Sequence, residues 1–178
     1  MKTNRLFLIA ILAAAPMATF AREQPARNPR LEVSFHEPKN FTDIGDTYMA
    51  SDSARESDLA EIRSYLSDQS RYYVPEGHRL EITFTDIDRA GDFEPWRGAR
   101  FGDVRIVKEI YSPRMVLAFR MVDASGNVVK EGRRELRDLA FMQKINLGSR
   151  SEPLHHDKAL LNDWLRSEFP RVRKDGST

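Results

Sequence analysis

One short segment combines aromatic, acidic and basic side chains at close spacing. The sequence FEPWRG at residues 93–98 places two aromatic residues three positions apart, and a further arginine follows at position 100. Trp96 could stack on a sugar or anchor a protein partner, with Glu94 and Arg97 fixing the orientation of the bound group. In the other interpretation, the two aromatic side chains close the open end of the core. The candidate binding residues are Phe93, Glu94, Trp96, Arg97 and Arg100.

Three carboxylates before this segment have part of the spacing of a calcium loop. Asp86, Asp88 and Asp92 occupy its first, third and seventh positions. The fifth position is Ala90, however, and the twelfth, which supplies a bidentate glutamate in calcium loops, is Arg97. The pattern therefore favours a strand end followed by turns, in which aspartates bind local backbone groups.

The same acidic side chains could act as a general acid and base. A hydrolase of this kind would use Asp86, Asp88 or Glu94, and it needs two carboxyl groups that face one cleft with separated pKa values. Sequence spacing does not show such an arrangement. The chain also contains no Gly-x-Ser-x-Gly elbow for a serine nucleophile. We therefore predict no catalytic residue.

Histidines near the C-terminus suggest a half-site for a metal ion. Adjacent His155 and His156 diverge by about 100° on a helix, so they do not easily share one ion. Glu152 and His156 lie four residues apart, and Asp163 follows on the same face, but no further ligand is visible. The chain has no cysteine for a thiolate site. We predict neither a metal nor a cofactor.

Alternating apolar and polar residues predict the strands that must position these groups. The longest irregular stretch is expected over 86–103, and a hairpin turn over 123–127. Gly132 could form a bulge in the last strand. The expected strands are 31–35, 80–84, 104–110, 115–121 and 128–136.

Helical periodicity predicts two helices. The first begins near Ser53, whose spacing from Glu56 matches a capping box, and it ends before Pro75. The second is opened by Ser151-Glu152-Pro153 and ends at Pro170. The apolar faces are Leu59, Ile62, Leu66 and Tyr73 in the first helix, and Leu154, Leu161, Trp164, Leu165 and Phe169 in the second.

The order of these elements predicts an α+β fold. It is a two-layer sandwich with a mainly antiparallel sheet of four to five strands and both helices on one face. Arg105, Arg114 and Arg120 alternate with apolar residues, so they should lie on the open face of the sheet. That face is either an ordinary solvated surface or a site for an anionic ligand.

The N-terminus predicts export. Residues 1–21 combine Lys2 and Arg5, a short apolar run, and small residues before Arg22, which is typical of a cleaved signal peptide. The run is too short for a membrane span, and no comparable run follows. A cysteine-free exported chain fits a bacterial periplasm. We expect a flexible leader over 22–30, a single domain over 31–170 and a polar tail over 171–178.

The charge balance argues against nucleic acid as a partner. The chain has 28 basic and 27 acidic residues, whereas a dedicated nucleic-acid binder normally carries a clear basic excess.

Several separated motifs resemble one family of proteins. They are Val33-Ser34-Phe35 with Phe41-Thr42-Asp43, the segment 93–98, Leu136–Phe141 and Asp157–Trp164. In this order they are similar to the bacterial family named domain of unknown function 3016, over roughly Leu31 to Phe169. The resemblance implies an exported single-domain protein, and it supplies no activity, cofactor or catalytic residue.

The residues favour a binding domain over an enzyme. We predict a non-enzymatic periplasmic domain that binds an envelope protein or glycan through the loop Phe93–Arg100. The alternatives are the hydrolase described above and a structural subunit whose loop packs internally. Neither the partner nor the oligomeric state follows from the sequence.

Overall fold

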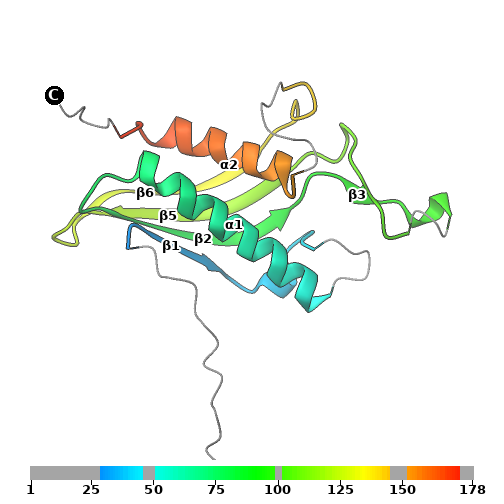
Figure 1. The fold of residues 1–178 in the computed structure, drawn as a ribbon, viewed down its shortest axis with the longest axis horizontal. Helices are drawn as coiled ribbons and strands as arrows, with labels where there is room; N and C mark the ends of the chain where they lie inside the picture. The colour runs from blue at the N-terminus through cyan, green and yellow to red at the C-terminus, as the bar shows by residue number, and fades with distance from the viewer. Residues whose placement is uncertain (1–28, 46–50, 99–101, 145–151, 173–178) are drawn as a thin grey trace, which may run out of the picture.

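A computed structural model describes residues 29–45, 51–98, 102–144 and 152–172. Within them the fold is α+β, as predicted, and α1 and α2 lie on one face of the main sheet (Figure 1). The elements in chain order are β1 (Leu31–Phe35), η1 (Pro38–Asn40), α1 (Asp52–Tyr73), β2 (Arg79–Asp88), β3 (Asp92–Phe93), η2 (Pro95–Arg97), β4 (Arg105–Ile106), β5 (Arg114–Val122), β6 (Val128–Arg137) and α2 (His155–Glu168).

The main sheet has four strands in the order β1-β2-β5-β6. β1 is parallel to β2, because α1 forms the crossover between them, and the β2–β5 and β5–β6 pairs are antiparallel. β3 and β4 form a separate two-stranded sheet. The sheet is therefore mainly antiparallel, as the sequence predicts.

The core lies between the main sheet and the two helices. Alternate residues of β2 and β5 are buried, and the apolar faces predicted for both helices pack against them. Phe119 of β5 is the clearest example, because its ring makes edge contacts with Trp164 at 5.7 Å and Phe169 at 5.5 Å between ring centroids. Such aromatic contacts add to the stabilisation from burial itself.

α1 begins near Ser53, as predicted, but with a different cap, and α2 begins later than predicted. The N-cap of α1 is Ser51, whose hydroxyl accepts a hydrogen bond from the Ala54 amide at 3.1 Å, so Ser53 is not the cap. α2 begins at His155, because buried Leu154 has a left-handed backbone (φ 57°) that separates the preceding turn from the helix. Ser151 lies outside the described residues.

The strand boundaries also differ in two places. β2 continues to Asp88, so Asp86 and Asp88 belong to a strand rather than to the irregular stretch. A register shift between Phe84 and Asp86 lets the strand continue while Ile87 stays buried. The strand predicted over 104–110 is reduced to β4, because the chain turns after it and pairs only with β3.

Gly132 is not a bulge. It stays in register opposite Phe119, and the irregularity of this hairpin lies between Met121 and Val122. A Cβ atom at position 132 would lie 3.1 Å from the Phe119 ring and 2.9 Å from the Arg134 guanidinium. The glycine therefore leaves room for the aromatic ring that fills this part of the core.

The open face of the sheet carries paired charges. Arg114 binds Asp86, and Arg120 lies 3.7 Å from Glu81. Arg105 belongs to β4 and is not on this face, so the predicted set of three arginines is not brought together there. Among the described residues, no helix has the length and apolar composition that crossing a membrane requires.

Candidate functional site

An arm extends beyond the end of the main sheet (Figure 1). We define the arm as residues 91–111, which include β3, η2 and β4. Its two limbs are joined at the base, where the Gly91 amide donates to the Tyr111 carbonyl at 3.0 Å. Gly91 has φ +84°, and a Cβ there would lie 3.0 Å from the Ile106 carbonyl oxygen, so only glycine fits this junction without strain.

Glu94 braces the arm from inside. Its side chain is 3% exposed, and it accepts hydrogen bonds from the Lys108 ammonium and from the Tyr111 hydroxyl at 2.9 Å. The Arg97 guanidinium lies 3.5 Å away. The Lys108 hydrogen bond is the main cause that holds the pKa of Glu94 below its usual value. Glu94 therefore joins the outgoing limb to the returning limb as an ionised group.

The two aromatic residues of the predicted loop differ in their surroundings. Phe93 is buried, and the Arg105 guanidinium lies 4.6 Å from its ring centroid, a cation–π contact. Trp96 is 71% exposed. The interpretation that both rings close the core is therefore wrong for Trp96. Arg97 is half-exposed beside it, and Arg100 lies outside the described residues.

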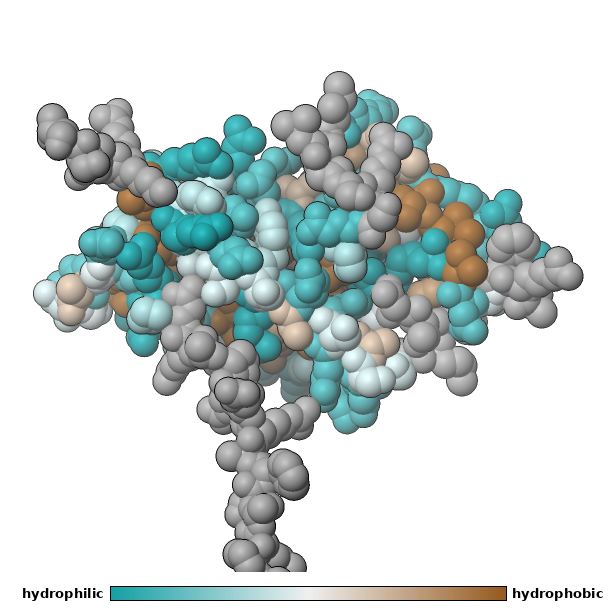
Figure 2. Space-filling model, in the orientation of Figure 1, coloured by the Kyte–Doolittle hydropathy of each residue, from teal (hydrophilic) through white to brown (hydrophobic). Residues whose placement is uncertain are grey.

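Half of the large apolar side chains exposed among the described residues lie on the arm. Besides Trp96, the arm exposes Val104, Val107 and Ile110, of which Ile110 is 74% exposed. Figure 2 shows hydrophobic surface on the side of the domain from which the arm projects. Exposed apolar residues gathered on one element are typical of a protein-binding surface, whereas single scattered ones are ordinary.

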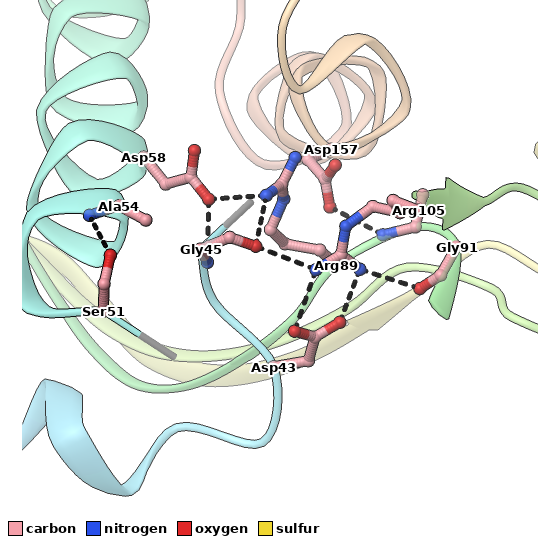
Figure 3. Close-up of polar contacts among 10 residues, drawn as sticks. Asp43, Gly45, Ser51, Ala54, Asp58, Arg89, Gly91, Arg105 and Asp157 are labelled. Carbon is pink, nitrogen blue, oxygen red and sulfur yellow. Dashed lines mark hydrogen bonds and ion pairs between the residues drawn. The ribbon is translucent and has the colours of Figure 1, made fainter. Parts of the chain in front are cut away.

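A buried ionic network, which the sequence did not predict, holds the base of the arm (Figure 3). Arg89, just after β2, donates to the Asp58 carboxylate at 2.6 Å and to the Gly45 carbonyl at 2.9 Å. The Gly45 amide in turn donates to Asp58 at 2.8 Å. The network thus links α1, the loop before it and the end of β2.

Arg105 extends this network into the arm. Its guanidinium contacts both carboxylate oxygens of Asp43, at 2.5 and 3.0 Å, and donates to the carbonyls of Gly45 and Gly91 at 2.9 Å each. A bidentate arginine–carboxylate pair fixes orientation as well as distance. The arm therefore leaves the domain in a defined direction.

Asp157 brings α2 into contact with the same region. It lies in the first turn of the helix, is 2% exposed and accepts a hydrogen bond from the Ala90 amide at 3.2 Å. Burial raises the pKa of Asp157 to about 6, although Arg89, the Ala90 amide and Arg105 act in the opposite direction. A buried carboxyl in this state titrates close to neutral pH.

A cavity of about 500 Å³ lies beside the network, between the base of the arm and the end of the main sheet. Three aromatic side chains line it, together with carboxylates and arginines. Burial, and next the neighbouring Asp43 carboxylate, raise the pKa of Asp88 in its wall. The aromatic, acidic and basic side chains of its lining include Phe41, Phe93, Tyr111, Asp88, Asp92, Arg55, Arg89 and Arg137.

The family model described as "Protein of unknown function (DUF3016)" matches residues 29–167. The chain belongs to this family. The match includes the arm, the buried network and the cavity, and it confirms the family suggested by the sequence motifs. No curated protein and no solved structure matches the chain.

The three acidic residues proposed for catalysis lie in different surroundings in this DUF3016 domain. Only Asp88 lines the cavity. Asp86 accepts hydrogen bonds from the Thr42 amide, the Thr42 hydroxyl and Arg114. Burial raises the pKa of Asp86, but these hydrogen bonds and the charge of Arg114 together hold the pKa below its usual value. Glu94 binds Lys108 and Tyr111 within the arm.

The predicted half-site for a metal is not assembled in the DUF3016 domain. Glu152 binds Lys158 at 2.7 Å, Asp163 binds Lys144 at 2.6 Å, and the His156 ring packs edge-on against Phe141. Within the described ranges, no three histidine, aspartate or glutamate side chains are placed to hold a metal ion. Asp86, Asp88 and Asp92 likewise form no such group.

Proposed function

We propose that this DUF3016 protein is an exported, non-enzymatic domain of the bacterial envelope that binds a partner protein through its arm. The observation that carries the proposal is the exposure of Trp96 on an arm that Glu94 and Arg105 brace. Tryptophan is enriched among the residues that dominate binding energy. A braced arm supports such an anchor, because little conformational entropy is lost when the partner binds.

The composition of the arm favours a protein over a glycan as the partner. Sugar recognition relies on aromatic faces and numerous polar groups, whereas the arm also exposes the aliphatic side chains of Val104, Val107 and Ile110. Aliphatic side chains gain free energy when they pack against an apolar protein surface. The glycan remains an outcome of the test below.

Trp96→Ala should abolish partner capture and leave the fold intact. Because Trp96 is exposed, we expect the free energy of unfolding to change by no more than about 0.5 kcal/mol. Capture from envelope extract, compared with wild type, measures the loss of binding. Leu139→Ala is the matched control, since Leu139 is 70% exposed but lies in the connection between β6 and α2.

Fluorescence gives a second measurement of the same prediction. The chain has two tryptophans, and Trp164 is buried in the core, so a change in emission on binding should come from Trp96. A partner that covers the arm should shift this emission to shorter wavelength. Equal capture by wild type, Trp96→Ala and Leu139→Ala would contradict the proposal, and capture by purified envelope glycan alone would identify a glycan partner instead.

The proposed location is supported by the N-terminal sequence. Residues 1–21 have the charge, apolar run and small residues of a signal peptide. We expect the mature protein to begin at Arg22 and to fractionate with the periplasm. N-terminal sequencing of the fractionated protein checks this, and retention of Met1 on the accumulated protein would exclude cleavage.

The hydrolase remains an alternative prediction. It would depend on Asp88, which lines the cavity with a raised pKa and so resembles a proton donor more than Asp86 or Glu94 do.

A further inference from the structure

We propose that the cavity at the base of the arm binds a short peptide with free ends, its ammonium group on Asp88 and Asp92 and its carboxylate on Arg137. This ligand site lies apart from Trp96 and does not rest on the proposed function of the arm. Charged side chains in the cavity wall that form no close ion pair support this site.

The acidic wall lacks a close counter-ion. Asp92 accepts a hydrogen bond from the Phe93 amide at 2.7 Å, and no basic side chain of the described residues lies within 4.0 Å of it. Asp88 has a single basic neighbour in range, Arg114, at the limiting distance of 4.0 Å. Two neighbouring carboxylates without a close basic partner attract a cationic group.

The basic wall is likewise uncompensated. The Nε atom of Arg137 donates to the Ser112 hydroxyl at 3.2 Å, and no carboxylate of the described residues lies within 4.0 Å of its guanidinium. The other two arginines of the cavity differ, because Arg55 binds Asp52 and Arg89 binds Asp58. Arg137 is therefore the arginine in this wall that is available to an anion, and its fork suits a carboxylate.

The spacing of the two walls sets the size of the ligand. Asp88, Arg114 and Arg137 follow one another across β2, β5 and β6, so the Cα atoms of Asp88 and Arg137 are separated by two strand spacings, about 10 Å. The side chains of Asp88 and Arg137 form no ion pair with each other within 4.0 Å. A peptide chain extends by about 3.3–3.6 Å per residue, so two or three residues place an ammonium and a carboxylate at such a separation.

The remaining lining fits the middle of a peptide. Phe41, Phe93 and Tyr111 add apolar surface to the same cavity, and its volume of about 500 Å³ lies within the range of small-ligand sites. A single amino acid holds its two charges too close together to reach both walls. A peptide without free ends lacks one or both charges.

The test is calorimetric titration of the mature protein with trialanine at pH 7. We expect saturable binding, weakened at least about tenfold when the probe is N-acetylated or C-amidated, because each cap removes one of the two charged contacts. The double variant Asp88→Asn/Asp92→Asn should show a smaller difference in affinity between free trialanine and the N-acetylated probe than the wild type does. Arg137→Gln should show a smaller difference in affinity between free trialanine and the C-amidated probe. Arg137→Lys should restore part of that difference.

Controls separate this site from the arm and from loss of structure. Trp96→Ala should bind trialanine as wild type does, even where it fails to capture the partner. Each cavity variant is first compared with wild type by thermal melting, and the Arg137→Lys variant keeps the test valid should Arg137→Gln unfold. Absence of trialanine binding to the wild type, or equal affinity for free and capped peptides, would overturn the inference.

Discussion

Asp58→Ala should lower the free energy of unfolding by about 3–5 kcal/mol. The substitution deprives the buried Arg89 guanidinium of its carboxylate partner and the Gly45 amide of its acceptor. Removing one member of a buried ion pair is costly, because the remaining charge stays out of water without compensation. Urea denaturation of wild type and variant, compared at equal slope, measures the loss.

Asp52→Ala is the matched control in the same helix. Asp52 pairs with Arg55 across one turn, but its side chain is 72% exposed, so its removal should cost less than about 1 kcal/mol. The double variant Asp58→Leu with Arg89→Met should be less destabilised than Asp58→Ala, since the buried guanidinium is then removed together with its carboxylate partner. Equal stability of Asp58→Ala and Asp52→Ala would show that the buried pair contributes nothing.

Much of the core was predictable because it depends on local periodicity. Met115, Leu117, Phe119 and Met121 are spaced two residues apart, and a strand places alternate residues on one face whatever the rest of the chain does. The same holds for Ile62 and Leu66 on α1. Helix starts were less predictable, since Ser51 and Ser53 are both good caps and only the fold selects one.

The buried network could not be assembled from the sequence, because its members come from distant segments. Asp43, Asp58, Arg89, Arg105 and Asp157 lie on five separate parts of the chain. One local signal existed, however. Asp58 lies four residues before Ile62, on the apolar stripe of the helix, where a charge must find a buried partner.

The exposure of Trp96 was undecidable from the sequence for a related reason. An aromatic residue next to proline and arginine is compatible with a core plug and with a surface anchor. The choice depends on the arm, which places Phe93 under Arg105 and leaves Trp96 outside. Since Arg105 also binds Asp43, the direction of the arm and the shape of the cavity depend on the same buried charges.

Asp157→Asn should stabilise the domain relative to wild type as pH rises from about 4 to about 7. The pKa of Asp157 is about 6 in the folded state and 3.8 as its ordinary value. Between these pH values the folded state binds more protons than the unfolded state, so the wild type loses stability as pH rises. A difference of about two pKa units corresponds to about 3 kcal/mol. The wild type should therefore have lost about this much free energy of unfolding once the pH exceeds the folded-state pKa of Asp157.

Asparagine keeps an oxygen that can accept from the Ala90 amide and does not ionise, so the variant escapes this loss. The free energy of unfolding is measured for both proteins at several pH values. The difference between the two proteins at each pH reports on Asp157, because the contributions of the other titrating groups are the same in both and cancel. Asp86→Asn is the control of opposite sign: the pKa of Asp86 is lowered by folding, so Asp86 stabilises the wild type above its ordinary pKa and less as pH falls further. A constant difference between Asp157→Asn and wild type from pH 4 to pH 7 would mean that Asp157 ionises as freely in the folded domain as in the unfolded chain, and would place it outside the buried network.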